Sequence, residues 1–276
     1  MPELPEVEVT ARALARRFEG RRIDAVRVHD SRLRWKVPRD LGAALAGQRI
    51  ERIARRGKYL LWYLPGGVLI CHLGMSGSWR VYEAAAAPAR QRHDHLELFC
   101  DGAVARLNDP RRFGAVLWHP RARGDALLHP LLASLGMEPF DPRFDGDLLF
   151  RATRGRRIAV KQMLLGGRVV VGVGNIYATE SLFAARIHPA AQAGRIGRAR
   201  YARLADSIRA VLQRAIEAGG STLRDFSDTQ GVEGSYTEHA QAYDRAGQPC
   251  PRCGTPIRRL VQGQRATYFC PRCQRA

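Results

Sequence analysis

The first residues of the chain carry groups that could form a covalent bond with a sugar carbon. Removal of Met1 would make Pro2 a free secondary amine, and small residues at position two normally permit that removal. An α-amino group has a reference pKa of about 7.7 to 8, so a share of such amines is uncharged near neutral pH. Only the uncharged form can attack carbon, which makes Pro2 a candidate nucleophile.

The residues after Pro2 predict a helix that would hold this amine in place. Pro5 suits a first helical position, and Gly20 suits a C-terminal cap. Between them, one apolar helical face is formed by Val7, Ala11, Leu14 and Phe18. The alternative is that Pro2 and Glu3 merely precede an ordinary amphipathic helix, so other features must decide.

Lysine is scarce in this strongly basic chain. The 276 residues include 45 basic and 26 acidic ones, and the only lysines are Lys36, Lys58 and Lys161. Arginine keeps its proton under working conditions, whereas the pKa of a lysine can be shifted for chemistry. Lys58, directly after Arg55-Arg56-Gly57, is therefore a candidate site residue, although an ordinary surface position explains it equally well.

The charge balance favours a polyanionic partner. A net charge of +19 points to nucleic acid or an acidic membrane surface. No apolar run approaches the roughly 18 residues of a membrane span, and the N-terminus lacks a signal-peptide pattern. We therefore expect a soluble cytoplasmic protein with no membrane contact.

The strongest local pattern is the pair of cysteine pairs near the C-terminus, Cys250, Cys253, Cys270 and Cys273. This spacing predicts one structural zinc ion held by four thiolates, with no open position for catalysis. The same segment is rich in arginine, which indicates contact with a DNA backbone; a protein-binding ribbon with a solvated basic face is the alternative. Cys71 and Cys100 lie in apolar runs and are expected to be buried thiols.

Two kinds of secondary structure follow one another along the chain. Residues 21–119 show short strands and turn signals, with hairpins predicted at Pro65-Gly66-Gly67 and Asp101-Gly102, as in a sandwich or barrel. Helical periodicity then covers roughly 127–135, 148–165, 176–185 and 198–218, with a linker at 141–146. The polar segment 221–246 is expected to be a long loop.

Two loops and one helix start present side chains suited to DNA. Met75 in the loop 72–77 and Phe113 in the loop 109–114 each stand next to glycine, and they could wedge between bases while Arg111 fills the vacated space. Ordinary core packing is the alternative for both. Asn175 begins a predicted helix, whose N-terminus suits a phosphate, although a simple helix cap explains it as well.

Together these segments make the chain resemble the formamidopyrimidine-DNA glycosylase family of bacterial base-excision repair enzymes over essentially its full length. The matching segments are 2–8, 58–61, 72–77, 109–114, 172–177, 219–223 and 264–265. The resemblance implies an α+β protein with an N-terminal β-sandwich, a helical helix–two-turn–helix domain and a four-cysteine zinc ribbon. We expect these at 1–130, 131–220 and 247–276, with a lesion-recognition loop at 221–246.

The resemblance also implies roles for individual residues. By the family pattern Pro2 attacks C1′ of the damaged nucleotide and Glu3 donates a proton, with Glu6 close by as catalytic support. Lys58 would serve β-elimination, and Arg265 would grip the lesion phosphate and serve δ-elimination. The DNA-binding positions implied in the same way are His72, Met75, His93, Arg111, Phe113, Arg156, Lys161 and Asn175.

The function that this resemblance implies is a monomeric bifunctional glycosylase and AP lyase. It would excise 8-oxoguanine and formamidopyrimidines from double-stranded DNA containing oxidised bases. The alternatives are an endonuclease VIII-like enzyme for oxidised pyrimidines and a non-catalytic zinc protein that binds damaged DNA. Leu4 and the wedge residues argue against the first, and the intact Pro2, Glu3 and Lys58 argue against the second.

Two departures from the family pattern bear on lesion preference. Leu165-Gly166-Gly167-Arg168 stands where an Asp-Gln-like polar pair is usual, which predicts a looser or differently capped helix end. Ala242 stands where larger apolar residues are usual, in the segment linked to base recognition.

Overall fold

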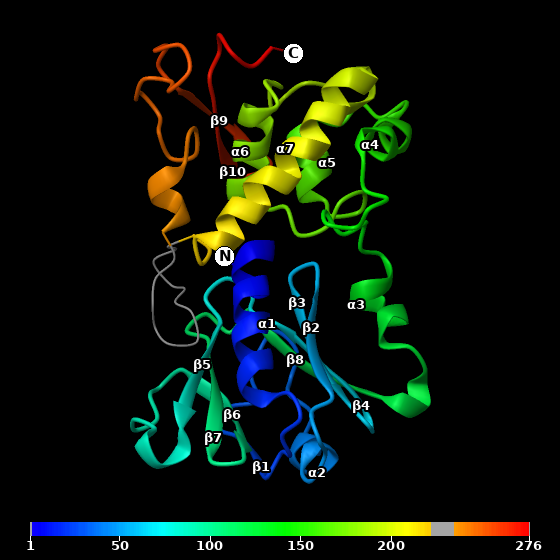
Figure 1. Ribbon diagram of the computed structural model, residues 1–276, viewed down its shortest axis with the longest axis vertical. Helices are drawn as coiled ribbons and strands as arrows, with labels where there is room; N and C mark the ends of the chain where they lie inside the picture. Colours follow the sequence, from blue (N-terminus) through cyan, green and yellow to red (C-terminus); the bar gives the residue numbers. More distant parts are fainter. Residues whose placement is uncertain (1, 222–234, 276) are drawn as a thin grey trace. The chain divides into compact units, whose positions relative to one another are not determined.

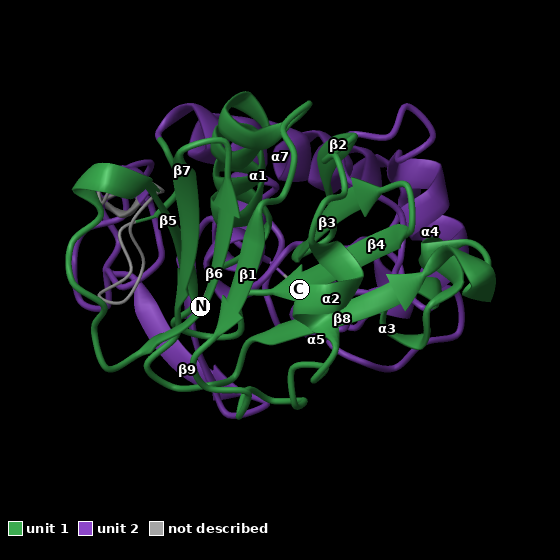
Figure 2. Cartoon of the chain, turned by 90° about the horizontal axis from the view of Figure 1, so that it is seen from below, with its two compact units in different colours: residues 1–133, 219–234 green, residues 134–218, 235–276 purple. Residues whose placement is uncertain are grey.

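The protein is described here from a computed structural model that covers residues 2–221 and 235–275, apart from the side chain of Thr237. The chain divides into two compact units. Unit 1 comprises residues 1–133 with 219–234, and unit 2 comprises residues 134–218 with 235–276 (Figure 2). The greater part of the expected loop 221–246, namely 222–234, lies outside the described residues.

Unit 1 is a sandwich of two antiparallel four-stranded sheets. One sheet has the order β1 (Ala25–Val28), β6 (Asp94–Cys100), β7 (Ala103–Asn108) and β5 (Ser78–Glu83). The other has the order β2 (Arg52–Arg56), β3 (Tyr59–Leu64), β4 (Gly67–His72) and β8 (Ala115–Pro120). The predicted sandwich is confirmed, and so are both predicted hairpins.

The core of unit 1 joins both sheets to the N-terminal helix α1 (Leu4–Phe18). Phe18 of this helix lies 6.0 Å from Trp62 of β3, measured between ring centroids, and Trp62 lies 5.6 Å from Trp79 of β5. These rings are buried, and such aromatic pairs dominate core energetics. The apolar stripe predicted from the sequence is thus buried in this core. Figure 1 shows α1 lying beside the strands of unit 1. A short helix α2 (Leu41–Leu45) was not predicted.

The end of unit 1 holds short helices in place of the single helix expected at 127–135. A 3₁₀ turn at Ala126–Leu128 precedes α3 (Pro130–Ala133). His129 separates the two in an extended conformation, because Pro130 disfavours a helical conformation in the residue before it. Other single 3₁₀ turns lie at Ala84–Ala86 and Arg121–Arg123.

Unit 2 combines four helices with a two-stranded ribbon. The helices are α4 (Gly146–Thr153), α5 (Val160–Leu165), α6 (Asn175–Ala184) and α7 (Arg198–Glu217). The ribbon is formed by β9 (Arg258–Gln262) and β10 (Arg265–Phe269), and 3₁₀ turns lie at Ala193–Arg195 and Tyr236–His239. None of the helices within 2–221 and 235–275 is long and apolar enough to cross a membrane.

The helix predicted over 148–165 is wrong as a single element. The chain leaves α4 at Arg154, and Gly155 adopts a φ of +73°, a conformation that favours glycine and stops a helix. A second helix begins only at Val160, after Ala159 in an extended conformation. The predicted linker 141–146 contains Asp145, whose carboxylate caps α4 by accepting the N–H of Leu148 at 2.7 Å.

Candidate active site and nucleic-acid interface

The N-terminal residues are fixed by one buried carboxylate. Glu6 Oε2 accepts the N–H of Glu3 at 2.8 Å, and Glu6 Oε1 accepts the N–H and the hydroxyl of Ser221 at 2.7 and 2.8 Å. The N–H of Glu3 belongs to the peptide bond of Pro2, which is itself buried. Glu6 therefore holds the peptide that carries the candidate nucleophile.

Gly219 and Gly220 do more than end α7. Gly220 has a φ of +89°, and a Cβ at this position would lie 3.1 Å from Glu6 Cγ and Oε1. Only glycine therefore lets the chain pass close enough to Glu6 for Ser221 to donate both of its hydrogen bonds. This contact joins two ends of unit 1 that are 215 residues apart in sequence.

Lys58 stands in a tight hairpin turn that is bonded to α1. Gly57 and Lys58 connect β2 to β3, and Gly57 has a φ of +60°, as the first central residue of a type II′ turn requires. Arg55 Nε donates to Glu8 Oε2 at 2.7 Å, and Arg55 Nη1 donates to the Gly57 carbonyl at 3.0 Å. Burial opposes the charge of Glu8, but its bonds to Arg55 and Arg12 outweigh burial and lower its pKa.

His72 ends β4 as a neutral imidazole. Its Nδ1 accepts the N–H of Gly74 at 2.9 Å, which places the ring proton on Nε2. Burial, with smaller contributions from the charges of Lys58 and Arg34, lowers the pKa of His72 to about 4. The ring also packs on Tyr59 with a centroid separation of 4.7 Å.

The two predicted wedge loops touch one another and share Asp109. Its buried carboxylate accepts the Ser76 hydroxyl at 2.7 Å and the Gly114 N–H at 2.8 Å. Ser76 Oγ in turn accepts the N–H of Arg111 at 3.2 Å. A Cβ on Gly74 would lie 2.4 Å from the carbonyl carbon of Phe113, so glycine is what lets the loops approach.

The side chains on these loops point to solvent, as wedges would require. Met75 is 36% exposed and Phe113 is 46% exposed, which argues against the alternative that they fill the core. The Arg111 guanidinium lies 5.0 Å from the centroid of the Phe113 ring. His93 lies beside them, because its carbonyl accepts the N–H of Asp109.

In unit 2, two of the predicted site residues lie in or against the ribbon. Arg265 begins β10, directly after a turn in which Gly263 and Gln264 have φ values of +53° and +62°. Asn175 at the start of α6 donates through Nδ2 to the Ala266 carbonyl at 3.2 Å, so its side chain docks the ribbon. The exposed Arg156 lies beyond α4.

Lys161 differs from the expected DNA contact. Its side chain has no exposed surface, and Nζ donates to Thr267 Oγ1 at 2.8 Å and to the Ala266 carbonyl at 3.3 Å. A buried ammonium must be paired with such acceptors. In this structure Lys161 holds β10 against α5 and presents no charge to solvent.

The four clustered cysteines form a site for one structural zinc. All four sulfur atoms lie within 4.8 Å of one another, with Cys253 to Cys270 at 3.5 Å and Cys250 to Cys273 at 4.0 Å. Zn–S bonds of about 2.3 Å in a tetrahedron place sulfurs about 3.8 Å apart, so the donor set fits zinc. The expected thiols Cys71 and Cys100 are buried and free, and burial raises the pKa of Cys100 to about 12.

The two departures from the family pattern take definite forms. Gly166 and Gly167 close α5, with Gly167 at a φ of +66°, as in a glycine C-cap. Ala242 is fully buried in the ribbon core beside Phe183, and its N–H donates to Glu180 Oε1 at 2.9 Å. This position therefore packs the ribbon within unit 2.

Sequence reasoning missed the residues that hold the site together. Asp109, Ser76 and Arg55 were not singled out, because buried polar bonds between distant segments leave no periodicity. Asp109 belongs to the segment 109–114, one of those that carry the family resemblance. The sequence feature that could have identified it is an acidic residue directly after a predicted strand and before Pro110.

Comparisons with known proteins agree along the whole chain. Family models match at 1–116 (Formamidopyrimidine-DNA glycosylase N-terminal domain), 135–227 (Formamidopyrimidine-DNA glycosylase H2TH domain) and 247–276 (Zinc finger found in FPG and IleRS). Proteins named formamidopyrimidine-DNA glycosylase from Burkholderia vietnamiensis and Paraburkholderia phytofirmans are 57% and 55% identical, each with full coverage of both chains.

Solved structures give the same result for the fold. A mutant Lactococcus lactis FPG in complex with DNA containing Fapy-dG has a TM-score of 0.90 at 34% identity, with 100% of both chains covered. Lactococcus lactis Fpg with DNA containing an abasic site also has a TM-score of 0.90 at 34% identity, covering 99% of this chain and 100% of that one.

Proposed function

Because this chain belongs to the formamidopyrimidine-DNA glycosylase family, we propose that it is a DNA glycosylase for oxidised purines and an AP lyase. Its substrate is duplex DNA containing 8-oxoguanine or formamidopyrimidines. Support comes from relatives bearing the glycosylase name and from the Lactococcus lactis structures bound to Fapy-dG and abasic DNA. The net charge of +19 suits that partner.

The reaction that fits the residues uses the amine of Pro2, freed of Met1. Its nitrogen bonds to C1′ as the glycosidic bond breaks, and Glu3 supplies a proton to the leaving base. The C1′–O4′ bond then breaks, O4′ takes up a proton as the sugar ring opens, and C1′ and the proline nitrogen form an iminium. The iminium acidifies the C2′ hydrogen, and loss of that proton breaks the C3′–O bond and expels the 3′ phosphate. A single nucleophile thus serves excision and strand cleavage.

The observation that carries this proposal is the buried bond from Glu6 to the Pro2–Glu3 peptide. A nucleophile must be held in a reactive geometry, and a chain terminus is ordinarily mobile. Here the Glu6 carboxylate, which also accepts two hydrogen bonds from Ser221, holds the peptide next to the amine. We assign Glu6 to positioning, Lys58 to the elimination steps and Arg265 to the lesion phosphate.

The DNA-contact roles that we propose are those that the family resemblance implies. Met75, Arg111 and Phe113 would fill the gap left by the extruded nucleotide, and their exposure within unit 1 supports this for Met75 and Phe113. His72, His93, Arg156 and Asn175 would each contact DNA. Zinc keeps the ribbon folded and takes no part in a chemical step. The free thiols Cys71 and Cys100 suit a reducing compartment, so we propose that the protein is cytoplasmic. We also propose that it acts as a monomer, as the family resemblance implies.

Borohydride trapping on an 8-oxoguanine duplex tests the enzyme directly. Protein whose mass shows loss of Met1 should form a covalent complex, and the Pro2→Gly variant should trap at least tenfold less. No trapped species from Met1-free protein would refute the enzyme and favour a non-catalytic damaged-DNA-binding protein. A lesion panel separates the endonuclease VIII-like alternative, which would favour oxidised pyrimidines.

A further inference from the structure

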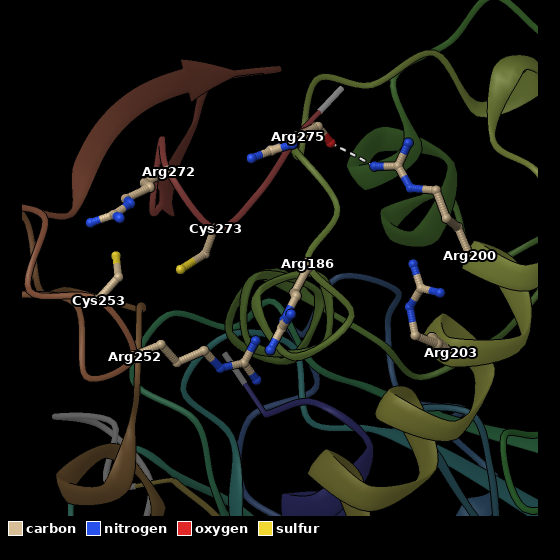
Figure 3. A pocket seen from close by; sticks show the side chains of 8 residues that line it. All are labelled: Arg186, Arg200, Arg203, Arg252, Cys253, Arg272, Cys273 and Arg275. Atoms are coloured by element: carbon tan, nitrogen blue, oxygen red, sulfur yellow. Dashed lines mark hydrogen bonds between the residues drawn. The ribbon is translucent and has the colours of Figure 1, made fainter.

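Unit 2 contains a cavity of about 860 Å³ whose lining is unusual in composition. Six arginines and two cysteines line it: Arg186, Arg200, Arg203, Arg252, Arg272, Arg275, Cys253 and Cys273. No carboxylate and no aromatic ring is among these lining residues. Figure 3 shows arginines around the cavity that come from the residue segment after α6, from the start of α7 and from the cysteine-bearing segments before β9 and after β10.

The cavity lies away from Asn175 and Arg265, two of the residues in unit 2 that we propose to contact DNA. Arg186 follows the C-terminal end of α6, whereas Asn175 begins this helix. Ten helical residues separate the two ends by about 15 Å. The cysteines lie beyond the far end of β10 from Arg265, and a five-residue strand spans about 17 Å.

Several of these arginines are held in place by backbone contacts. Arg252 Nη1 donates to the Phe183 carbonyl at 3.1 Å, and its guanidinium lies 4.7 Å from the Phe183 ring centroid. Arg200 Nη2 donates to the Arg275 carbonyl at 2.6 Å. Burial and the charge of Arg203 lower the pKa of Arg200, which reflects crowding of like charges.

An anion that contacts several guanidinium groups at once is held by charge-assisted hydrogen bonds to each of them. Six arginines line this one open pocket, so a ligand with several linked anionic groups can reach more than one of them. The absence of aromatic rings in the lining removes the stacking platform that a nucleobase needs. These features together favour a chain of phosphates over a nucleoside.

We propose that this arginine cavity is a binding site for a compact polyphosphate, separate from the DNA site. The ligand carries at least three linked phosphates, either as inorganic polyphosphate or as the triphosphate of a nucleotide. Since it bridges arginines of the ribbon and of α6 and α7, its binding secures the ribbon and slows the loss of zinc.

Calorimetric titration of the zinc-loaded full chain with tripolyphosphate at fixed ionic strength tests the site. The Arg186→Ala/Arg203→Ala variant should bind at least tenfold more weakly. The matched control Arg143→Ala/Arg151→Ala removes the same charge from exposed side chains of unit 2 and should change affinity less than twofold. Equal binding by both variants would overturn the proposal.

Further arms identify the ligand. ATP binding as tightly as tripolyphosphate would show that a nucleotide can supply the triphosphate, and weaker binding of ATP would assign the site to the inorganic chain. AMP binding as tightly as tripolyphosphate would overturn the need for linked phosphates. A tenfold loss of affinity for undamaged duplex in the cavity variant, with tripolyphosphate binding kept, would make this a DNA contact and refute the proposal.

A zinc-release assay gives a readout independent of catalysis. With a colorimetric chelator, tripolyphosphate should slow zinc release from the wild type and from the control variant at least threefold, and should leave release from the cavity variant unchanged. Unchanged release in all three proteins would refute the bridging role.

Discussion

Replacing Asp109 with alanine should impair base excision far more than cleavage at an existing abasic site. The change removes the acceptor of the Ser76 hydroxyl and of the Gly114 N–H, which lie 2.7 and 2.8 Å away. A buried donor left without a partner costs about 1 to 3 kcal/mol, so the two together cost about 2 to 6 kcal/mol. The lost bonds weaken the contact between the loop 72–77, which carries Met75, and the loop 109–114, which carries Phe113.

The effect on rate follows if the aligned loops fill the space of the extruded nucleotide. A loss of about 2 kcal/mol in the transition state slows excision about 30-fold, at about 1.4 kcal/mol for each factor of ten. An abasic nucleotide has no base to unstack. The rate of cleavage of an abasic duplex should therefore fall less than about fivefold, which corresponds to the loss of about one hydrogen bond, or about 1 kcal/mol. Single-turnover kinetics on duplexes with 8-oxoguanine and with an abasic site measure both.

Ser76→Ala is the graded control, because it keeps the bond between Asp109 and Gly114 and removes only the serine hydroxyl, which donates to Asp109 and accepts the N–H of Arg111. We expect about a threefold to tenfold loss of excision, corresponding to about 1 kcal/mol. Circular dichroism checks that each variant is folded. Equal losses in excision and in abasic cleavage by folded Asp109→Ala would refute the positioning argument.

Three further predictions concern the N-terminal clamp, the buried histidine and the metal. Glu6→Gln places an amide N–H₂ against donor groups, so borohydride trapping should fall about tenfold or more, at a cost of about 1 to 3 kcal/mol; wild-type trapping would contradict the clamp. The pKa of His72 is lowered to about 4, so the unfolded chain takes up this proton first and stability should fall as pH drops from 6.5 to 4. In urea unfolding at several pH values, the free energy of unfolding of His72→Gln should decrease less between pH 6.5 and 4 than that of the wild type. An equal decrease in both proteins would contradict the role of His72. Chelation of zinc, or Cys253→Ser, should unfold the ribbon and abolish duplex binding in a mobility-shift assay, while the near-ultraviolet signal of Trp62 and Trp79 is kept; retained binding without zinc would contradict the assignment.

The sequence predicted elements where a local pattern has a physical cause. The α1 stripe, the hairpins at Pro65 and Asp101 and the four-cysteine spacing each depend on neighbours in sequence, and each is confirmed. The helix predicted over 148–165 failed because apolar periodicity continued across Gly155, whose positive φ ends α4.

The hydrogen bonds that hold the site residues in place could not be predicted from patterns of neighbouring residues in the sequence. Asp109 with Ser76, Arg55 with Glu8 and Lys161 with Thr267 are partners in folded space, and nothing in their spacing links them. A lone buried lysine such as Lys161 looks the same in sequence as one facing a phosphate. The candidate roles themselves came from the family resemblance, because a proline before a helix carries no such meaning alone.

The bond between Glu6 and Ser221 also sets an order of events during synthesis. The two residues are 215 positions apart, so both bonds from Ser221 to Glu6 are absent until Ser221 has been synthesised. Until then the first residues lack these contacts. We therefore expect Met1 to be removed before the contact forms, so that the amine is made first and is fixed in place afterwards.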